Sequence, residues 1–481
     1  MANSDASDVL KISTKEVAAN PCSRGPGRTA YKNVFGLSVS VMLLFCAFQG
    51  LQSLQSSINS SGGLGLVSLA ILYVFFVIAG FVTPGIVKIL GTKYALMGGM
   101  VCHFIYVASN YYSDWYTLIP SSILLGFASG PIWAAVSVHL TEIAVKVAPI
   151  LKETHQNLIG QFTGILFLFF QLSQIPGNLA SSLILLYSES NVTSENCTNF
   201  SATMIEHNYI YILISVFLLF DIAAIVTLAL TVDQLPRETP FRLTKNKFQV
   251  FLLTPLIDTF KVLVNWKMFF VGFMFIMAGL EQSFIFGTFT QKYVSECVGV
   301  SRVGFMIIVL GLTSAAMSAL LSRLLKYVPR FVFVIAAGLI NSGLLIFLVT
   351  WKQTASYLLI FLFPIGWGIA DAIWNTISSS FVGILFPRNS DPAYSIARMW
   401  LALGFVIGFI AANFGDIAAR VYLLLAVAVV TVVLYLVVEV MVYLQSKRPQ
   451  PPLAVDEINL TELDRSPVSS SPEPLNTDDA V

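Results

Sequence analysis

The sequence predicts an all-α multi-pass membrane protein with twelve transmembrane helices, divided into two related six-helix halves. Three observations lead to this fold class: an apolar composition, twelve hydrophobic runs of membrane-spanning length, and an internal repeat near half the chain length. Of the 481 residues, 56% are hydrophobic and only 11% are charged. Soluble domains carry about 25% charged residues, so this chain has too few polar residues to cover a water-exposed surface.

Hydrophobic runs cross a bilayer when they contain roughly twenty residues of helix. The runs found here are separated by segments that are polar or contain Pro, Gly or Asn. The predicted spans are 34–53, 64–84, 93–111, 117–140, 158–184, 208–231, 268–290, 303–322, 330–350, 356–384, 396–414 and 420–444. The polar segment before the first run lacks the apolar stretch of a cleavable signal peptide, so we expect the first span to act as its own insertion signal.

Lys and Arg residues predict the orientation, because basic residues gather in cytoplasmic loops. The loop at 185–207 contains none, whereas the loop at 232–267 contains several. With both termini in the cytosol, only four of the 27 Lys and Arg residues fall on the opposite side: Lys292, Arg302, Lys352 and Arg420.

The runs and the basic residues together divide the chain into five regions. The C-terminal region is rich in Pro, Ser and acidic residues, a composition typical of disorder. The regions are a cytosolic N-terminal tail (1–33), a first transmembrane half (34–231), a cytosolic central loop (232–267), a second transmembrane half (268–444) and a disordered cytosolic C-terminal tail (445–481).

Acceptor sequences for N-glycosylation agree with this orientation, since Asn-x-Ser/Thr is modified on the lumenal side. Asn191, Asn196 and Asn199 lie together in the predicted extracellular loop, and Asn59 lies just after the first span, close to the membrane. We predict glycosylation at these four positions.

Two of the five cysteines, Cys197 and Cys297, fall in predicted extracellular loops. In an oxidising compartment such a pair often forms a disulfide. The alternative is two thiols that are free or separately buried, and the sequence leaves this choice open.

Short internal matches predict a duplication. Gly-Leu-Gln at 50–52 resembles Gly-Leu-Glu at 279–281, and the Gly and Trp pattern of 126–133 resembles that of 366–374. The offsets are similar and close to half the chain. Two six-span halves related by an axis along the membrane normal are the major facilitator architecture. In that architecture spans 1, 4, 7 and 10 line a central cavity.

Polar and aromatic residues within those spans are therefore candidate cavity residues, because a polar group in a membrane is costly without a partner or a function. Asp371 and Asn375 are four residues apart and share a helix face. The polar candidates are Gln49, Gln52, Gln55, Glu281, Gln282, Asp371 and Asn375, and the aromatic candidates are Trp133 and Trp374.

Each candidate also has a structural interpretation. Asp371 and Glu281 either form a cation or proton site or are hydrogen-bonded carboxyls that hold helices together. The glutamines either face the cavity as ligand contacts or bond helix to helix, and the tryptophans either line the cavity or pack. Arg398, at the start of the eleventh run, either pairs with a cavity acid or extends to the cytosolic face.

Motifs of catalysis are not found. The four histidines are scattered, no Cys/His cluster has metal-ligand spacing, and there is no phosphate-binding loop, dinucleotide turn or nucleophile elbow. We expect no enzyme activity, no cofactor, no metal and no nucleic-acid partner.

Specific stretches carry a resemblance to a known family. They are AFQGLQSLQSSIN (47–59), QIPGNLASSLI (174–184), GLEQSFIFGTFTQKYVSECVG (279–299), GWGIADAIWNTI (366–377) and RMWLALGFVIGF (398–409). With these stretches the chain resembles the uncoordinated-93 family of ion-channel regulatory proteins within the major facilitator superfamily, most closely its homolog A branch. The resemblance covers about residues 34–440.

The resemblance implies twelve spans, a glycosylated plasma-membrane protein, an ion-channel or other membrane-protein partner, and no catalysis. The founding role of the family is regulation of a two-pore potassium channel complex in muscle, and another branch escorts nucleic-acid-sensing Toll-like receptors to endosomes. The leading hypothesis is therefore a non-enzymatic regulator of an ion channel.

Two alternatives stay open. The first is a secondary transporter of an unknown solute, with Asp371 and Glu281 as a cation or proton site. The second is a trafficking escort for another membrane protein. Major facilitator transporters carry an acidic residue in the loop between spans 2 and 3, and Lys88 occupies that position here. This departure, together with a disulfide between Cys197 and Cys297 if it forms, argues against rapid alternating access.

Overall fold

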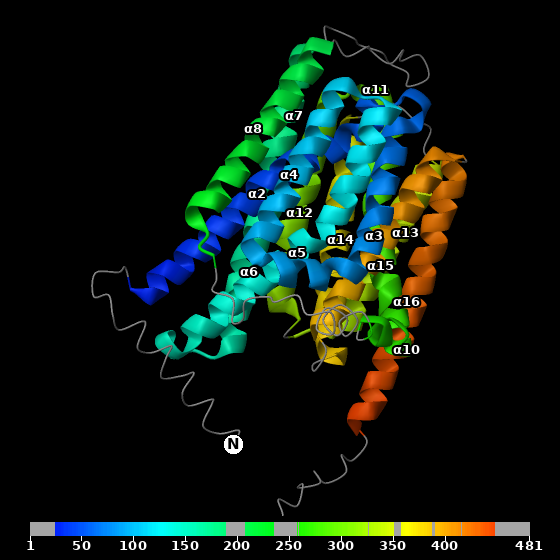
Figure 1. The fold of residues 1–481 in the computed structure, drawn as a ribbon. Helices are drawn as coiled ribbons and strands as arrows, with labels where there is room; N and C mark the ends of the chain where they lie inside the picture. The colour runs from blue at the N-terminus through cyan, green and yellow to red at the C-terminus, as the bar shows by residue number, and fades with distance from the viewer. Residues whose placement is uncertain are drawn as a thin grey trace, which may run out of the picture. The chain divides into compact units, whose positions relative to one another are not determined.

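The computed structural model describes residues 25–188, 207–234, 257, 259–325, 327–350, 357–386, 390–414 and 416–447. The regular structure in these ranges is helical (Figure 1). The helices are α2(Pro26–Ile58), α3(Leu64–Leu90), α4(Thr92–Ser109), α5(Trp115–Leu151), α6(His155–Leu172), α7(Gln174–Ser188), α8(His207–Thr231), α10(Trp266–Ser283), α11(Glu296–Val298), α12(Ser301–Leu324), α13(Arg330–Thr350), α14(Tyr357–Leu385), α15(Ser390–Asn413) and α16(Ile417–Lys447), with the π-helix η4(Phe284–Ser295) and the short 3-10 helices η1(Ser61–Gly63) and η2(Asn110–Tyr112).

Among the described residues, 10 helical stretches are long and apolar enough to cross a membrane. The two remaining predicted runs, 93–111 and 356–384, are also helical and correspond to α4 and α14. The all-helical membrane fold is confirmed, and a full count of twelve spans stays a prediction.

The fifth predicted run is one span built from two helices, α6 and α7. Pro176 explains the break between them. Proline has no backbone N–H, and its ring clashes with the carbonyl four residues earlier, here that of Leu172. The helix α6 ends at this residue, and Ser173 separates it from α7.

The seventh predicted run, 268–290, is longer than expected and changes its helical form. The helix α10 passes into η4, a π-helix of 12 residues, and then into the single turn α11. Most π-helical segments are single turns and occur often at functional sites. Sequence periodicity did not predict this change.

The described residues divide into two units, one that ends at Val438 and one that begins at Glu439. Within the first unit, α2 packs against α6, α7 and α8, and α10 packs against α14 and α15. We call α2–α8 the first group of helices and α10–α15, with η4, the second group. The two groups meet mainly through three pairs of elements: α3 with α15, α7 with α12, and α2 with η4. We call the end of the bundle where α2 begins the inner end, and the end where α2 stops and α3 starts the outer end (Figure 1).

Glycines permit the closest of these helix contacts. A Cβ at Gly279 of α10 would overlap the backbone carbonyl of Leu401 in α15, and one at Gly404 would overlap the carbonyl of Ile276. Small residues let helix backbones approach in membranes, where lipid provides no hydrophobic drive between helices. The backbones of α10 and α15 are therefore in direct contact.

Candidate functional site in a central cavity

A cavity of about 760 Å³ lies between the two groups of helices. Its walls come from α2, α3, α4, α5, α6, α10, η4, α12, α14 and α15, with one residue from α7. The sequence-predicted residues that line it are Gln49, Gln52, Trp133, Gln282, Asp371 and Asn375.

Asp371 is the acceptor at the centre of a hydrogen-bond cluster. Its Oδ1 accepts from Gln282 Nε2 at 2.7 Å and from Asn375 Nδ2 at 2.8 Å, and its Oδ2 accepts from Ser314 Oγ at 2.9 Å. All three donors are neutral, and Asp371 has no ion pair with a described residue. The cluster links α10, α12 and α14, because each helix supplies at least one of its members. Asp371 is only 8% exposed, and its two oxygens already have partners.

Glu281 lies away from the cavity. It is 1% exposed, and its Oε2 accepts a hydrogen bond of 2.6 Å from Asn341 Nδ2 of α13. Consecutive residues of an α-helix point about 100° apart, so Gln282 and Glu281 cannot face the same side. Since Gln282 reaches Asp371 in the cavity wall, Glu281 is turned towards α13. The two acids that the sequence grouped together thus have different hydrogen-bond partners, and only Asp371 lines the cavity.

The glutamines of α2 do not form one stripe along the cavity. Gln49 and Gln52 line it, and Gln52 Nε2 donates to Tyr73 Oη at 3.2 Å. Gln55 instead donates to Asn110 Oδ1 at 2.8 Å and is fully buried near the outer end. Positions three apart advance about 300° around a helix, so the stripe winds away from the cavity over two steps.

Trp374 also lies outside the cavity lining and is fully buried. It precedes Asn375 in the chain, and Asn375 points at Asp371, so the indole ring faces a different direction. The internal repeat predicted that Trp133 and Trp374 are equivalent aromatic residues of the cavity, but only Trp133 lines it.

Asn59 belongs to the same buried network as Gln55. Its Nδ2 donates to Gln55 Oε1 at 2.7 Å and to Asn110 Oδ1 at 3.1 Å. A glycan on this amide would require the network to open. The other predicted acceptors, Asn191, Asn196 and Asn199, lie outside the described residues.

Cys297 is disulfide-bonded. Its predicted partner, Cys197, lies outside the residues that the structure describes, so the pairing stays a prediction. Cys46 and Cys102 are free.

An aromatic cluster forms the opposite wall of the cavity. The Trp133 ring lies 5.3 Å from the Phe45 ring and 5.2 Å from the Phe170 ring, centroid to centroid, and the two Phe rings are 4.9 Å apart. We call Phe45, Trp133 and Phe170 the aromatic wall. The Arg398 guanidinium of α15 lies 4.9 Å from the Trp133 ring centroid, within cation–π range. Arg398 therefore neither pairs with a cavity acid nor extends away from the cavity.

His103 and Asp221 form a buried pair that sequence reasoning missed. His103 Nδ1 lies 2.9 Å from Asp221 Oδ1, and the side chains are 3% and 0% exposed. His103 lines the cavity, and its Nε2 has no hydrogen-bond partner among the described residues. A polar residue in each of two predicted spans was the available signal, but the 118 residues between them concealed the contact.

The outer end of the cavity is closed by contacts between α2 and η4. Ser56 Oγ donates to the carbonyl oxygen of Phe286 at 3.2 Å, and the Ser57 and Ser295 hydroxyls are 2.7 Å apart. Nearby, α12 packs closely on α7 but touches α6 at few places. Because α6 is the inner part of that span, α12 packs less closely on this span towards the inner end.

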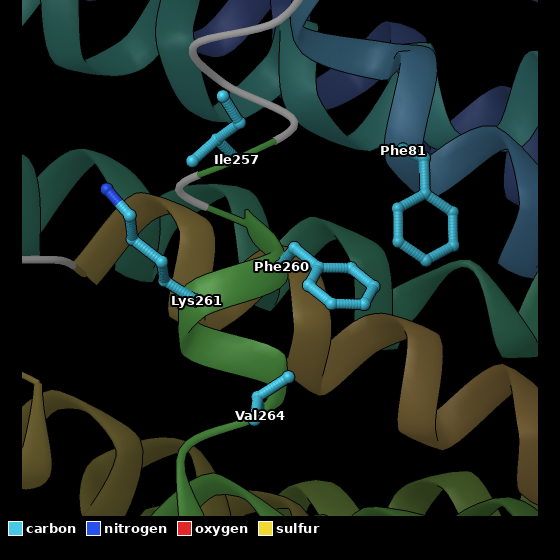
Figure 2. A pocket seen from close by; sticks show the side chains of 5 residues that line it. All are labelled: Phe81, Ile257, Phe260, Lys261 and Val264. Carbon is cyan, nitrogen blue, oxygen red and sulfur yellow. The ribbon is translucent and has the colours of Figure 1, made fainter.

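A second cleft of about 620 Å³ lies beside α3. Figure 2 shows Phe81 of α3 facing Phe260, while Lys261 points away from both rings. The remaining lining residues are Ile257 and Val264, so its surface is almost entirely apolar. It lacks the grouped polar side chains of the central cavity, which is therefore the candidate site.

The fold is that of the major facilitator superfamily. The solved structure of the nucleoside transporter NupG matches with a TM-score of 0.60 and 15% identity, covering 85% of this chain and 99% of that chain. A D-xylose-proton symporter matches with a TM-score of 0.58 and 13% identity, covering 84% and 95%. At this level of identity the likeness concerns the fold alone.

The chain belongs to the UNC-93 family. The family model, described as ion channel regulatory protein UNC-93, matches residues 55–436. Protein unc-93 homolog A of Xenopus laevis is 33% identical over 436 residues, which cover 87% of this chain and 95% of the relative. The homolog A protein of Homo sapiens is 31% identical over 448 residues, covering 90% and 97%.

A more distant relative is the unc-93 protein of Caenorhabditis elegans, whose name gives it as a proposed potassium channel regulatory protein. It is 27% identical over 424 residues, which cover 83% of this chain and 59% of the worm protein.

Proposed function

We propose that this protein is a non-enzymatic regulator of an ion channel in the plasma membrane, with a potassium channel as the first partner to test. The observation that carries the proposal is membership of the UNC-93 family, whose model covers most of the membrane-spanning part of the chain. The name of the worm relative supports potassium channels in particular. Cytosolic termini and glycans at Asn191, Asn196 and Asn199 are part of this proposal.

The state of the two acids supports regulation over cation-coupled transport. Asp371 already accepts three hydrogen bonds from neutral donors, and Glu281 is turned towards α13. A site for a coupling cation needs an acid that faces the cavity with oxygens available to the ion. The acids predicted for this role therefore act as ties between helices in our proposal.

The test is a whole-cell current measurement. The full chain is expressed alone and with a two-pore potassium channel, and surface biotinylation measures channel abundance in the same cells. We expect no current from the chain alone and an altered current on co-expression at unchanged surface abundance. An unchanged current on co-expression argues against regulation of that channel, and a change confined to surface abundance supports a trafficking escort.

Asp371→Asn refines the same test. An amide at this position presents N–H groups to a cluster that already consists of donors, so the link between α10, α12 and α14 weakens. We expect the regulated current to change in this variant. Asp416→Asn is the matched control, because Asp416 is exposed and does not line the cavity. An equal effect of both variants would mean that the cavity has no part in regulation.

A secondary transporter is the second candidate function. The observation in its favour is the cavity itself, which is lined by both groups of helices and lies in a fold shared with a nucleoside transporter and a D-xylose-proton symporter. Uptake of radiolabelled solutes by proteoliposomes that contain only this chain tests it. Uptake that disappears in Asp371→Asn, in a protein of unchanged thermal stability, would favour transport over regulation.

A further inference from the structure

The lining of the central cavity includes one carboxyl, Asp371, and one guanidinium, Arg398, and only the carboxyl is engaged in hydrogen bonds with described residues. Asp371 accepts three hydrogen bonds. Arg398, the other charged residue of the lining, makes no hydrogen bond or ion pair with the part of the chain that the structure describes. A ligand that pairs with the Arg398 guanidinium would therefore be an anion.

Arg398 is held in place by its contact with Trp133. The guanidinium carbon lies 4.9 Å from the ring centroid, and the side chain is half-buried in the cavity wall. A guanidinium carries five N–H donors in a planar fork that matches a carboxylate in a bidentate manner. This contact leaves the N–H donors of the guanidinium without a hydrogen-bond partner among the described residues.

The surface next to Arg398 is apolar and aromatic, and its three rings are inclined to one another at 45°, 80° and 73°. Phe45, Trp133 and Phe170 come from α2, α5 and α6 and pack ring against ring. Aromatic rings of a ligand stack favourably on such a surface. The cavity volume of about 760 Å³ lies within the range of small-molecule sites.

Neutral hydrogen-bonding groups complete the lining. Gln174 is 8% exposed, and its Oε1 has no partner among the described residues. Gln49 also lines the cavity and makes no hydrogen bond with the described part of the chain. Buried polar groups normally have partners, so Gln174 Oε1 is available to a polar ligand, and the Gln49 amide borders the same cavity.

We propose that the cavity binds a small organic anion, with a carboxylate on the Arg398 guanidinium and an aromatic body against the Phe45, Trp133 and Phe170 rings. Contacts between α2 and η4 close the outer end, so we expect ligands to approach from the inner end. This inference concerns binding only, so it holds whether the protein regulates a channel or transports a solute.

Isothermal titration calorimetry on the full-length protein in lipid nanodiscs tests the proposal. The probes are benzoate, 3-phenylpropionate and indole-3-acetate, each compared with its own uncharged amide. Charge-assisted bidentate hydrogen bonds are strong, so we expect the best carboxylate to bind about tenfold more tightly than its amide. The absence of binding by all three carboxylates, or equal affinity for acid and amide, would overturn the proposal.

Substitutions then assign the preference to Arg398. In Arg398→Gln the difference between carboxylate and amide should vanish, and Arg398→Lys should keep part of it because the charge remains but the fork is lost. Arg323→Gln is the control, because Arg323 is an exposed guanidinium at the inner end of α12 and should leave the preference intact. A preference that persists in Arg398→Gln would contradict the assignment.

A second variant covers the case in which Arg398→Gln does not fold. Trp133→Phe keeps an aromatic ring but reduces the stacking surface for both the guanidinium and the ligand. We expect weaker binding of both the carboxylate and the amide, with a thermal unfolding midpoint close to that of the wild type. Unchanged binding of both probes in this variant would show that the aromatic wall is not the binding surface.

Discussion

The helices α6 and α7 continue one another along a single predicted span, yet they lie in opposite environments. In α7, a Cβ at Gly177 would overlap the backbone carbonyl of Cys46 in α2. In α6, no atom lies within 4 Å of the Cβ positions of Gly160 and Gly164. The outer part of the span is packed at backbone distance, whereas the inner part borders open space.

The difference shows how one span can close the outer end of the bundle and also line the central cavity. Pro176 breaks the backbone hydrogen-bond ladder near Leu172, so the two helices are free to take different directions. The outer part seals the bundle against α12, where a Cβ at Gly304 would overlap the carbonyl oxygen of Asn178. The inner part supplies Gly164 and Phe170 to the cavity wall.

The largest expected effect comes from filling the α2–α7 contact. Gly177→Val places methyl groups against the α2 backbone, which cannot give way as a flexible side chain can. Overpacking costs about 1–3 kcal/mol and more where backbone must move, so we expect most of the protein to be lost from the folded, monodisperse fraction.

Size-exclusion chromatography in detergent and the thermal unfolding midpoint measure this loss. Gly160→Val is the matched control in α6 and should fold, because its Cβ meets no atom within 4 Å. Comparable losses in the two variants would remove the distinction between the outer and inner parts of the span.

Side-chain hydrogen bonding gives the next largest effect. Asn178 of α7 is fully buried, accepts from Ser53 Oγ at 2.9 Å and donates to the carbonyl of Gln174 at 2.8 Å. Asn178→Ala removes both buried hydrogen bonds, each worth about 0.5–1.5 kcal/mol. Asn157→Ala, in α6, loses only an exposed bond to Glu153 and should change stability by less than about 0.5 kcal/mol.

Denaturation midpoints of the two Asn variants in detergent measure this difference. A larger loss for Asn157→Ala than for Asn178→Ala would mean that the inner part of the span, not the outer part, carries the stabilising contacts.

Solvent access sharpens the comparison without a large change in stability. Gly164→Cys puts a thiol into the cavity, and Ser181→Cys puts one at a buried position of α7. We expect a water-soluble maleimide to label the first rapidly and the second slowly, because only the first borders the cavity. Wild-type protein measures labelling of the native thiols.

The same thiol at position 164 also tests from which end of the bundle a reagent reaches the cavity. Labelling should proceed when reagent reaches the inner end, in inside-out vesicles if the termini are cytosolic, and should be slow in intact cells. Equal labelling from both sides would show that the outer contacts of α2 and η4 do not close the cavity.

The smallest expected effect lies at the inner end, where polar side chains tie α2 to the residues after α8. Burial by itself would raise the pKa of Asp233, but hydrogen bonds from Asn33 and Lys32 and the charge of nearby Lys93 bring that pKa below its usual value. A lowered pKa in the folded state stabilises the fold above the unfolded-state pKa of about 4, and the stabilisation is lost as the pH falls further.

Because the Asp233 side chain is 52% exposed, this contribution is less than about 1 kcal/mol. Asp233→Asn should lower the unfolding midpoint slightly at pH 7, and the difference from wild type should shrink below about pH 4. A difference that grows in acid would show that the sign of the pKa change is wrong.

Part of the candidate site could be predicted from the sequence. Asp371 and Asn375 share a helix face at a spacing of four residues, and their hydrogen bond follows from that spacing. The repeat placed α2, α5, α10 and α14 around a cavity, and all four contribute to its lining. Local periodicity and internal symmetry are both present in one chain, so they can be read without coordinates.

The partners across the cavity could not be predicted. Arg398 stacks on Trp133, and Ser314 donates to Asp371, through contacts between helices far apart in the chain. Periodicity defines the face of a helix but not the helix that it meets. The separation of Glu281 from Gln282 was predictable in principle from their 100° offset, but which of the two faced the cavity depended on the rotation of α10.

The sequence by itself determined that this protein is a helical membrane protein, where its hydrophobic runs lie and to which family it belongs. These properties depend on composition, on local hydropathy and on aligned residues, each of which is a property of the linear chain. Only the tertiary structure decided that the cavity has an engaged acid and a guanidinium with no partner among the described residues, and that one span is closely packed in its outer part and borders open space in its inner part. Those properties depend on helix rotation and on contacts between distant residues, which follow from how the whole bundle minimises its packing and hydrogen-bonding energy together.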